Sequence, residues 1–431
     1  MGKGFPVAAL LAWLLAAAYY FYQYALRSAP SVMMPQLSAA FGVNALGVAS
    51  VVGMFYSGYS PFSLVAGAAM DRFGAKRIIP IGAALVGAGA LLFSSGSVVV
   101  ASFGRFLQGA GGVFALVGAI YIATKYFPAS YAASLVGATQ MFGMAGGSAG
   151  QFLVGPLIKG GLPWGWFWTY AGFIGLAISV TLLLLLPREE RQEAKRTGDS
   201  ASVLGSLKTV FANPQSILCG LIAGLLFIPT TIFDMTWGVR FLQEGRGREY
   251  EEAVRIAATV PFGWMIGCPL LGFISDRIGR RKPVIFGGAL VLLAVLAWGL
   301  FGVHGFFRGG AVGIVMGIAS GAAMLPYTVI KEVNPPELGG SATGVVNFIN
   351  FTFSALLGPV FAHLLVEVSA GSESIALEHY QAAFKPMLFG IVAALILTCL
   401  LKETGSSARE LSKMTSDRRR GALPSGTALK R

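Results

Sequence analysis

One arginine, Arg27, lies inside the otherwise uncharged run of residues 5–69. A guanidinium in so apolar a segment is costly unless it faces the protein interior, water or a bound anion. At about 100° per residue, the polar residues near it fall on one helical face: Tyr20, Gln23, Tyr24 and Ser31. We therefore expect Arg27 to bind an anion; the alternative is an arginine satisfied by backbone carbonyls or a carboxylate.

Asp234 is the one acidic residue that we place deep in an apolar span of the second half of the chain. A carboxylate buried there favours its protonated form, so Asp234 is a candidate proton carrier. The alternative is a charge partner for Arg27 or Arg105, and the two roles can coexist. The residues expected on the same helical face, or beside it, are Phe227, Thr230, Thr231 and Trp237.

Two asparagines, Asn347 and Asn350, share a helical face with Phe351 and Ser354. Their amides favour hydrogen bonds to a ligand or to water, and the alternative is a polar contact between helices. Gln140 is their counterpart in the first half of the chain. The aromatic residues that could line a cavity are Tyr56, Tyr59, Trp264 and Tyr327.

The composition predicts an all-α membrane protein. Of 431 residues, 55% are hydrophobic and 12% are charged, which is too apolar for a soluble chain of this length. The apolar N-terminal stretch continues too far for a signal peptide and is taken as the first membrane helix. Three separated cysteines, and the lack of a phosphate-binding loop, metal cluster or nucleophile pattern, argue against an enzyme, an ATP-driven pump and a bound cofactor or metal.

Twelve apolar spans of about 20 residues can be marked off by polar, glycine and proline breaks. We place the spans near residues 7–31, 46–69, 78–97, 101–126, 132–158, 166–187, 216–241, 256–275, 284–303, 309–330, 341–366 and 383–401. The expected units are a six-helix bundle over 1–187, a cytoplasmic linker at 188–214, a second six-helix bundle over 215–401 and a tail at 402–431.

Lysine and arginine concentrate in the segments that share a side with the N-terminus. Because cytoplasmic loops carry this excess, we expect both termini in the cytoplasm and the protein in a bacterial inner membrane. The basic tail is expected to be disordered and to contact anionic lipid headgroups of the bilayer. No nucleic-acid partner is expected, and the expected state is a monomer.

Two sequence landmarks recur after nearly the same interval, so the halves of the chain are predicted to be structural repeats. GAAMDRFGAKR at residues 67–77 returns as GFISDRIGRRK at 272–282. KYFPASYAASLVGATQMFG at 125–143 aligns with EVNPPELGGSATGVVNFIN at 332–350. Parallel repeats of six helices predict a substrate path along their interface, near the middle of the membrane, with rocking of the halves as alternating access.

The doubled loop motif, G-x-x-x-D-R-x-G-x-K-R, resembles the signature of the major facilitator superfamily, and the resemblance extends over residues 7–401. It implies two pseudo-symmetric bundles of six transmembrane helices each. RFLQGAGG at residues 105–112 is similar to the family's second signature, in which the arginine, here Arg105, either contacts substrate or is structural. By resemblance, the residues that control the conformational change are Gly67, Asp71, Arg72, Gly74, Arg77, Gly272, Asp276 and Arg277.

The spacing of Arg27 and Pro35 is similar to that in two anion-transporting branches, the organophosphate antiporters and the anion:cation symporters. The chain departs from both. Gly112 stands where the symporters have a proton-carrying glutamate, and the second arginine and the histidine of the antiporters are missing, which disfavours a phosphate substrate. The expected substrate-binding residues are Arg27, Gln23, Tyr20, Tyr24, Arg105, Gln140, Thr231, Tyr327, Asn347 and Asn350.

These observations predict a secondary transporter of a small organic anion, a mono- or dicarboxylate, with protons as the coupling ion and Asp234 as the proton site. Two alternatives remain. A proton-driven efflux pump for drugs or cations would use Asp234 and the aromatic residues to hold a cation. A sensor of the same fold would signal through the basic tail.

Overall fold

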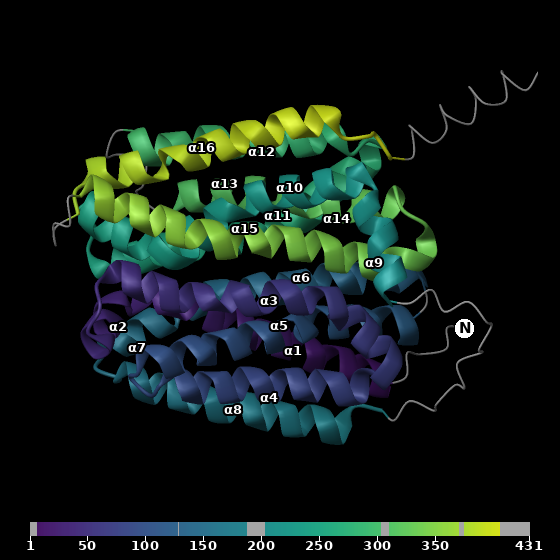
Figure 1. The fold of residues 1–431 in the computed structure, drawn as a ribbon, viewed down its shortest axis with the longest axis horizontal. Helices are drawn as coiled ribbons and strands as arrows, with labels where there is room; N and C mark the ends of the chain where they lie inside the picture. The colour runs from purple at the N-terminus through teal and green to yellow at the C-terminus, as the bar shows by residue number, and fades with distance from the viewer. Residues whose placement is uncertain (1–6, 128, 188–202, 303–309, 370–374, 406–431) are drawn as a thin grey trace, which may run out of the picture.

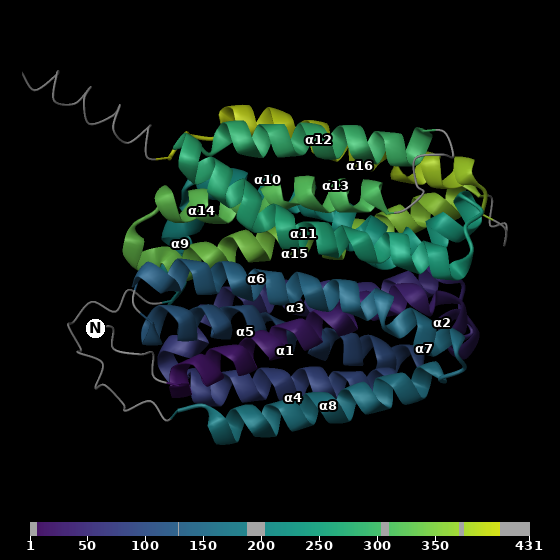
Figure 2. The ribbon, with the colours of Figure 1, turned by 180° about the vertical axis from the view of Figure 1, so that it is seen from behind.

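The structure, a computed structural model, describes residues 7–127, 129–187, 203–302, 310–369 and 375–405, and only the backbone of residues 71, 72, 129–134 and 203. Over these residues the chain is helical, without a strand. Figure 1 and the reverse view in Figure 2 show two bundles, one purple to teal and the other teal to yellow, stacked side by side. The expected all-α architecture of two bundles is confirmed.

The first bundle contains six long helices and three short ones. A 3-10 turn, η1, continues α1 after Ser28 because Pro30 removes a backbone donor there. The elements are α1 (Val7–Ser28), η1 (Ala29–Val32), α2 (Met34–Phe41), α3 (Ala45–Phe73), α4 (Ala75–Phe93), α5 (Val98–Tyr126), α6 (Ala129–Phe152), α7 (Val154–Lys159) and α8 (Trp164–Leu185).

The second bundle repeats this plan with more interruptions. Two stretches, η2 and η3, are π-helices, and η4 and η5 are 3-10 turns. The elements are α9 (Val203–Ala212), α10 (Pro214–Ile228), η2 (Pro229–Gly238), η3 (Phe241–Gly245), α11 (Tyr250–Ile278), α12 (Lys282–Phe301), α13 (Ala311–Ser320), η4 (Gly321–Met324), α14 (Leu325–Glu332), η5 (Pro336–Leu338), α15 (Gly339–Val368) and α16 (Leu377–Leu400).

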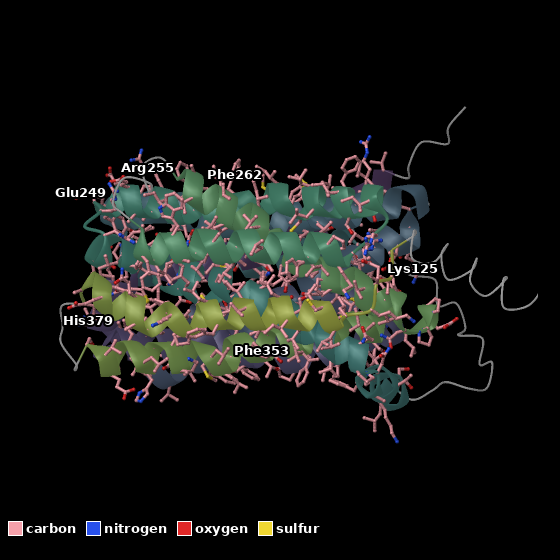
Figure 3. All side chains as sticks on the ribbon, turned by 90° about the horizontal axis from the view of Figure 1, so that it is seen from above. Lys125, Glu249, Arg255, Phe262, Phe353 and His379 are labelled. Atoms are coloured by element: carbon pink, nitrogen blue, oxygen red, sulfur yellow. The ribbon has the colours of Figure 1, made fainter. Side chains whose placement is uncertain are left out.

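Eleven helical stretches of the described residues are long and apolar enough to cross a membrane. The twelfth expected span corresponds to α6, whose 24 residues pack against α1, α5 and α11. Figure 3 shows labelled charged residues at the two ends, Lys125 at one and Glu249 and His379 at the other, with Phe262 on the flank between them. This distribution is the one a bilayer requires, because charged groups avoid its hydrocarbon core.

Glycines of α6 let α1 approach on one side and α11 on the other. A methyl group added to Gly146 would meet the Phe21 carbonyl, and one added to Gly143 would meet the Tyr20 ring. On the opposite side, a methyl group at Gly147 would lie 3.3 Å from Pro261 of α11. Since small residues are what permit such close helix contacts in a membrane, α6 ties α1 to the second bundle.

The bundles also contact each other near both ends. We call the end where α1 begins the near end, and the end that carries α2 and α7 the far end (Figure 1). Toward the near end, Ser60 of α3 donates to the Phe348 carbonyl of α15 at 2.9 Å. At the far end, the Tyr250 hydroxyl donates to the Val32 carbonyl at 2.7 Å, and Lys159 pairs with Glu251 at 2.8 Å.

The two copies of the loop motif lie at the near end and differ in their partners. Gly74 adopts a φ of 80°, which glycine tolerates, as expected for a tight turn. A methyl group at Gly67 would lie 3.9 Å from Gly340 across the bundle interface, whereas one at Gly272 would meet nothing within 4 Å. The Lys76 ammonium caps α8 by donating to the Leu186 carbonyl at 2.5 Å.

In the second copy, Arg281 forms ion pairs. Its guanidinium pairs with Asp276 and, at 3.0 Å, with Glu332. Burial opposes the charge, but the hydrogen bonds that Arg281 donates to Glu332 and Asp276 prevail and raise its pKa. Glu403, just after α16, accepts from the Arg281 backbone amide at 2.6 Å.

The other members of the expected gating set are less informative. Arg77 and Arg277 are exposed. The side chains of Asp71 and Arg72 lie outside the described residues, and so do residues 188–202 of the expected linker and residues 406–431 of the expected tail.

The close contact of α1 and α6 predicts a strong effect at Gly146 and none at a nearby glycine. Gly146→Ala should lower the melting temperature of the detergent-purified protein by about 5 °C or more, because the Phe21 carbonyl must move. Gly137→Ala on the same helix meets nothing within 4 Å and should leave the melting temperature unchanged or slightly higher. Equal melting temperatures for the two variants would contradict the packing described.

Candidate functional site

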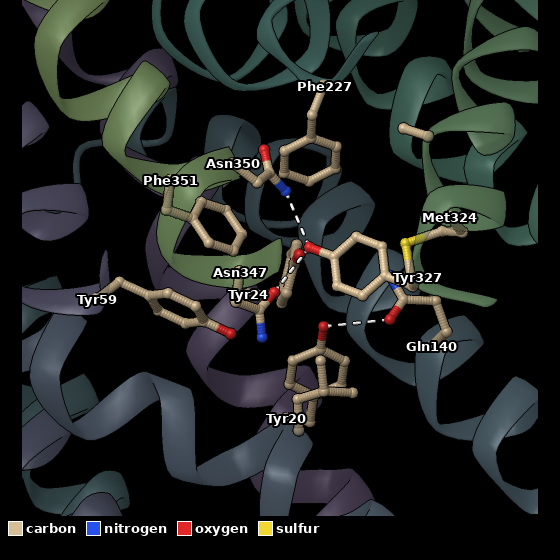
Figure 4. Close-up of a pocket in the computed structure, with 12 residues that line it drawn as sticks. Tyr20, Tyr24, Tyr59, Gln140, Phe227, Met324, Tyr327, Asn347, Asn350 and Phe351 are labelled. Carbon is tan, nitrogen blue, oxygen red and sulfur yellow. Dashed lines mark hydrogen bonds between the residues drawn. The ribbon is translucent and has the colours of Figure 1, made fainter. Parts of the chain in front are cut away.

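A cavity between the two bundles collects most of the expected binding residues (Figure 4). In this conformation the cavity is tight: its free volume is about 10 Å³, enough for about one water molecule, so a larger ligand requires the bundles to move apart. Five lining residues come from the first bundle and seven from the second, so a ligand held there touches both. The lining residues are Tyr20, Tyr24, Tyr59, Leu116, Gln140, Phe227, Ala323, Met324, Tyr327, Asn347, Asn350 and Phe351.

Arg27 lies behind this cavity, within a shell of aromatic rings. Its side chain is 2% exposed, and its Nε atom donates to the Tyr56 hydroxyl at 3.5 Å. Both terminal nitrogens of the guanidinium are buried without a hydrogen-bond partner. Six ring centroids lie 4.8–5.9 Å from its Cζ atom, and they belong to Tyr24, Phe55, Tyr56, Tyr59, Phe227 and Phe351.

The aromatic shell explains how an arginine with no counter-charge is tolerated in this interior. Ring faces attract a cation, although each contributes only about 0.5–2 kcal/mol, and they cannot accept the two free N–H pairs as a carboxylate can. Four of the six rings also line the cavity. The guanidinium therefore keeps free donors beside the cavity, and the expectation that it binds an anion stays a prediction.

A second polar group lies on the other bundle. The Tyr327 hydroxyl donates to Asn347 Oδ1 at 2.7 Å and accepts from Asn350 Nδ2 at 3.0 Å (Figure 4). The remaining amide atoms, Asn347 Nδ2 and Asn350 Oδ1, are buried without a partner. Across the cavity, the Tyr20 hydroxyl donates to Gln140 Oε1 at 3.3 Å. Buried polar groups without a partner are rare, so these atoms point to a polar ligand.

Gln23 supplies a physical reason for the unexpected glycine at position 112. A methyl group added to Gly112 would lie 2.9 Å from Gln23 Oε1, so the Gln23 side chain occupies the space that a larger residue at position 112 would need. Both polar atoms of this amide are buried and unpaired. The neutral amide of Gln23 on α1 thus occupies the space that an acidic side chain at position 112 of α5 would need.

Arg105, also expected to bind substrate, is arranged differently from Arg27. Its guanidinium donates to the carbonyls of Leu26 at 3.2 Å and Val52 at 3.4 Å, and to Gln108 Oε1 at 2.7 Å. It does not line the cavity. Because it holds the α1 backbone one residue before Arg27, the geometry favours the structural alternative, in which Arg105 positions the binding arginine.

Asp234 does not share the cavity with Arg27. It lies in the π-helix η2, where Thr236 Oγ1 bonds the Thr231 carbonyl five residues earlier. The i→i+5 pattern of a π-helix breaks the α-helical periodicity on which the expected common face of Phe227 and Asp234 depended. Phe227 faces Arg27, whereas the Asp234 carboxyl, 2% exposed, lines an apolar space formed by helices of the second bundle.

The charge-partner alternative for Asp234 is absent from this conformation. No ion pair among the described side chains involves Asp234, Arg27 or Arg105. The Asp234 Oδ2 atom is buried without a partner, and Gln151 of α6 faces the carboxyl. Gln151 in turn donates to Ser31 of η1 at 3.3 Å, so Asp234 lies at the contact between the bundles, toward the far end.

Two further expected residues contact neighbouring helices instead of the cavity. Thr231 shares a hydrogen bond of 3.1 Å with Ser354, and Trp264 donates to Thr230 at 2.8 Å. Three lining residues escaped the sequence analysis because apolar side chains carry no chemical signal: Leu116, Ala323 and Met324. Phe55 was missed for the same reason, although its ring faces both buried arginines.

Comparison with known proteins gives three informative matches. Residues 16–359 match the sequence model described as Major Facilitator Superfamily. The hexuronate transporter of Bacillus subtilis is 26% identical, over 79% of this chain and 84% of that protein. The multidrug resistance protein Stp of Mycobacterium tuberculosis is also 26% identical, over 77% of this chain and 72% of that protein.

A solved structure gives the same architecture. It is that of a bacterial homologue of the human lysosomal transporter Spinster, in an inward-facing and unoccupied conformation. It superposes with a TM-score of 0.70, at 16% sequence identity, over 92% of this chain and 96% of that one. At this identity the likeness supports the fold alone.

The two buried arginines should respond in opposite ways to the same substitution. Arg105→Gln should lower the melting temperature of the ligand-free protein by about 5 °C or more, because charge-assisted bonds to two carbonyls are lost. Arg27→Gln should leave the melting temperature unchanged or raise it, because it removes a buried charge that lacks a counter-charge. Thermal unfolding in detergent measures both, and destabilisation by Arg27→Gln as large as that by Arg105→Gln would contradict the assignment.

Proposed function

Because this chain belongs to the Major Facilitator Superfamily, we propose that it is a secondary transporter that moves a small organic anion by alternating access. The observation that carries the proposal is the Arg27 guanidinium, buried between the two bundles with both terminal nitrogens unpaired. A cation kept in this state is expensive unless an anion binds there.

The number of free cations at the cavity limits the charge of the substrate. Arg105 is engaged by carbonyls, and the described lining residues include no lysine, arginine or histidine besides the adjacent Arg27. One guanidinium matches one carboxylate in a two-pronged geometry, so a monocarboxylate or a dicarboxylate with one free end fits best. A hexuronate transporter among the relatives is consistent with such a substrate.

The alternative of drug or cation efflux is supported by relatives named for multidrug resistance, among them Stp and the multidrug resistance protein 3 of Bacillus subtilis. Its physical requirement is a carboxylate or an open aromatic cage at the cavity. The described lining residues include no carboxylate, and the aromatic shell already surrounds Arg27. The cavity therefore favours an anion.

Removal of the Arg27 charge should abolish anion binding without unfolding the protein. Thermal stabilisation of the purified protein by short carboxylates should be lost in Arg27→Gln, with affinity about 10- to 100-fold weaker, and should be partly kept in Arg27→Lys. Arg255→Gln, which alters an exposed arginine of α11, is the matched control and should bind normally. Stabilisation by lipophilic cations but by no carboxylate would favour the efflux alternative.

A flux assay separates a transporter from a sensor. Proteoliposomes containing the native protein should take up the identified anion in a saturable manner, and Arg27→Gln should reduce uptake to the level of empty liposomes. Saturable binding without flux would favour the sensor. We also propose a monomer in the inner membrane with both termini in the cytoplasm. Protease accessibility of each terminus in inside-out membrane vesicles tests the topology, and light scattering of the detergent-purified protein tests the monomer.

The proposed coupling ion is the proton, and the proposed carrier is Asp234. Its carboxyl is buried, has a free oxygen and lies beside Gln151 at the contact between the bundles. Gaining or losing a charge there would change how the two bundles pack toward the far end, which is what coupling requires. Gly112 removes the alternative acid on α5.

Asp234→Asn should separate exchange from accumulation. We expect the variant to exchange labelled for unlabelled anion across the vesicle membrane but to lose accumulation driven by a pH gradient, because it cannot release a proton. Glu378→Gln, at an exposed carboxylate of α16, is the control and should accumulate the anion normally. Accumulation unchanged in Asp234→Asn would remove the proton role.

A further inference from the structure

We propose that Tyr327, Asn347 and Asn350 form a hydroxyl-binding subsite, so that the transported anion is a monocarboxylate that carries several hydroxyl groups. The proposal rests on the anion-binding function of Arg27 for the carboxylate end of the ligand. It adds that the second bundle recognises the opposite end, and that both contacts are needed for transport.

The side chains of Asn347 and Asn350 are fixed in place, and each keeps one polar atom free. Both are buried, at 1% and 2% exposure, and the Tyr327 hydroxyl fixes them by bonding one atom of each amide. One donor, Asn347 Nδ2, and one acceptor, Asn350 Oδ1, remain without a partner. These two atoms lie on opposite sides of the Tyr327 hydroxyl (Figure 4), so each can bond a different hydroxyl group of a ligand.

The first-bundle side of the cavity also carries polar atoms. Tyr20 and Gln140 line it and share a hydrogen bond. Gln23, one helical turn before Arg27 on α1, does not line the cavity but has an unpaired donor and an unpaired acceptor. A ligand with a single hydroxyl would leave most of these atoms unsatisfied, at a cost of about 1–3 kcal/mol for each buried group. A chain or ring with several hydroxyls satisfies them together.

The second-bundle side of the cavity carries no charge among its described lining residues. The amides of Asn347 and Asn350 are neutral, and the described cavity lining offers no cation on the second bundle. A second carboxylate at that end would lose its hydration without gaining a counter-charge. The cavity therefore discriminates against dicarboxylates whose charges lie at opposite ends, and favours a carboxylate at one end with hydroxyls at the other.

The arrangement also connects recognition to movement. The carboxylate contacts an arginine of the first bundle and the hydroxyls contact amides of the second, so only a ligand with both groups attracts the two bundles to each other. A ligand can shift a conformational equilibrium only through contacts that differ between the states. An acid without hydroxyls should therefore bind the first bundle weakly and act as an inhibitor rather than a substrate.

The test compares ligands of six carbons that differ in one property. D-Gluconate, D-galactonate and D-glucuronate are hydroxylated monocarboxylates, hexanoate lacks hydroxyls, D-glucose lacks the charge and D-glucarate has a second carboxylate. Binding to the purified native protein should be at least tenfold tighter for one of the first three than for the others. Proteoliposomes should transport that acid, and hexanoate should inhibit its uptake without being transported.

The double variant Asn347→Leu with Asn350→Leu isolates the subsite. It should weaken binding of the preferred hydroxylated acid at least tenfold and leave hexanoate binding unchanged or tighter, which also shows that the variant is folded. Native binding of hexanoate as tight as that of every hydroxylated acid would overturn the proposal, and so would equal losses for both ligands in the double variant. Absence of binding by all three hydroxylated acids at millimolar concentration would overturn it as well.

Failure of this inference is distinguishable from failure of the proposed function. If hexanoate and gluconate bind equally and Arg27→Gln abolishes both, the anion-binding function stands and the hydroxyl subsite does not. If D-glucose binds as tightly as D-gluconate and Arg27→Gln changes neither, the anion-binding function itself is wrong.

Discussion

The buried charge of Arg27 is the constraint on which the rest of the site depends. A guanidinium without a counter-charge in a membrane interior persists only if its surroundings are built for it. Here the surroundings are six aromatic rings from both bundles, a neighbouring amide and a second arginine that fixes the α1 backbone. Close packing of α1 on the glycines of α6 then holds the guanidinium beside the cavity.

The two bundles repeat one plan but contribute different chemistry to the cavity. The first provides the cation and most of its aromatic shell, whereas the second provides amides fixed by a phenol. Among the described residues, the π-helices η2 and η3 occur in the second bundle, which also has a 3-10 turn at η4. Since irregular backbone in a membrane is tolerated where it is buried or lines a cavity, these breaks fit the role of the second bundle in recognition and movement.

Much of this could be predicted from the sequence, because membrane helices follow simple periodicity. Hydropathy and spacing predicted the helical fold and the helical faces on which Arg27 and Asn347 lie. Asp234 could not be placed, because a π-helix has no clear sequence signal and shifts every later residue around the axis. Arg105 and Arg281 depended on partners distant in sequence, the carbonyl of Leu26 and the carboxylate of Glu332.

The relation between Gln23 and Gly112 suggests how binding and coupling are divided in this protein. With a glutamate at position 112, the guanidinium of Arg27 and a carboxylate would share one wall, and substrate and proton would compete for the same charge. The amide of Gln23 fills that space instead and leaves Arg27 uncompensated. Under the proposed proton coupling, the coupling acid must then lie elsewhere. Asp234, beside Gln151 and away from the cavity, is the buried carboxyl at the bundle contact that meets this requirement without neutralising the substrate site.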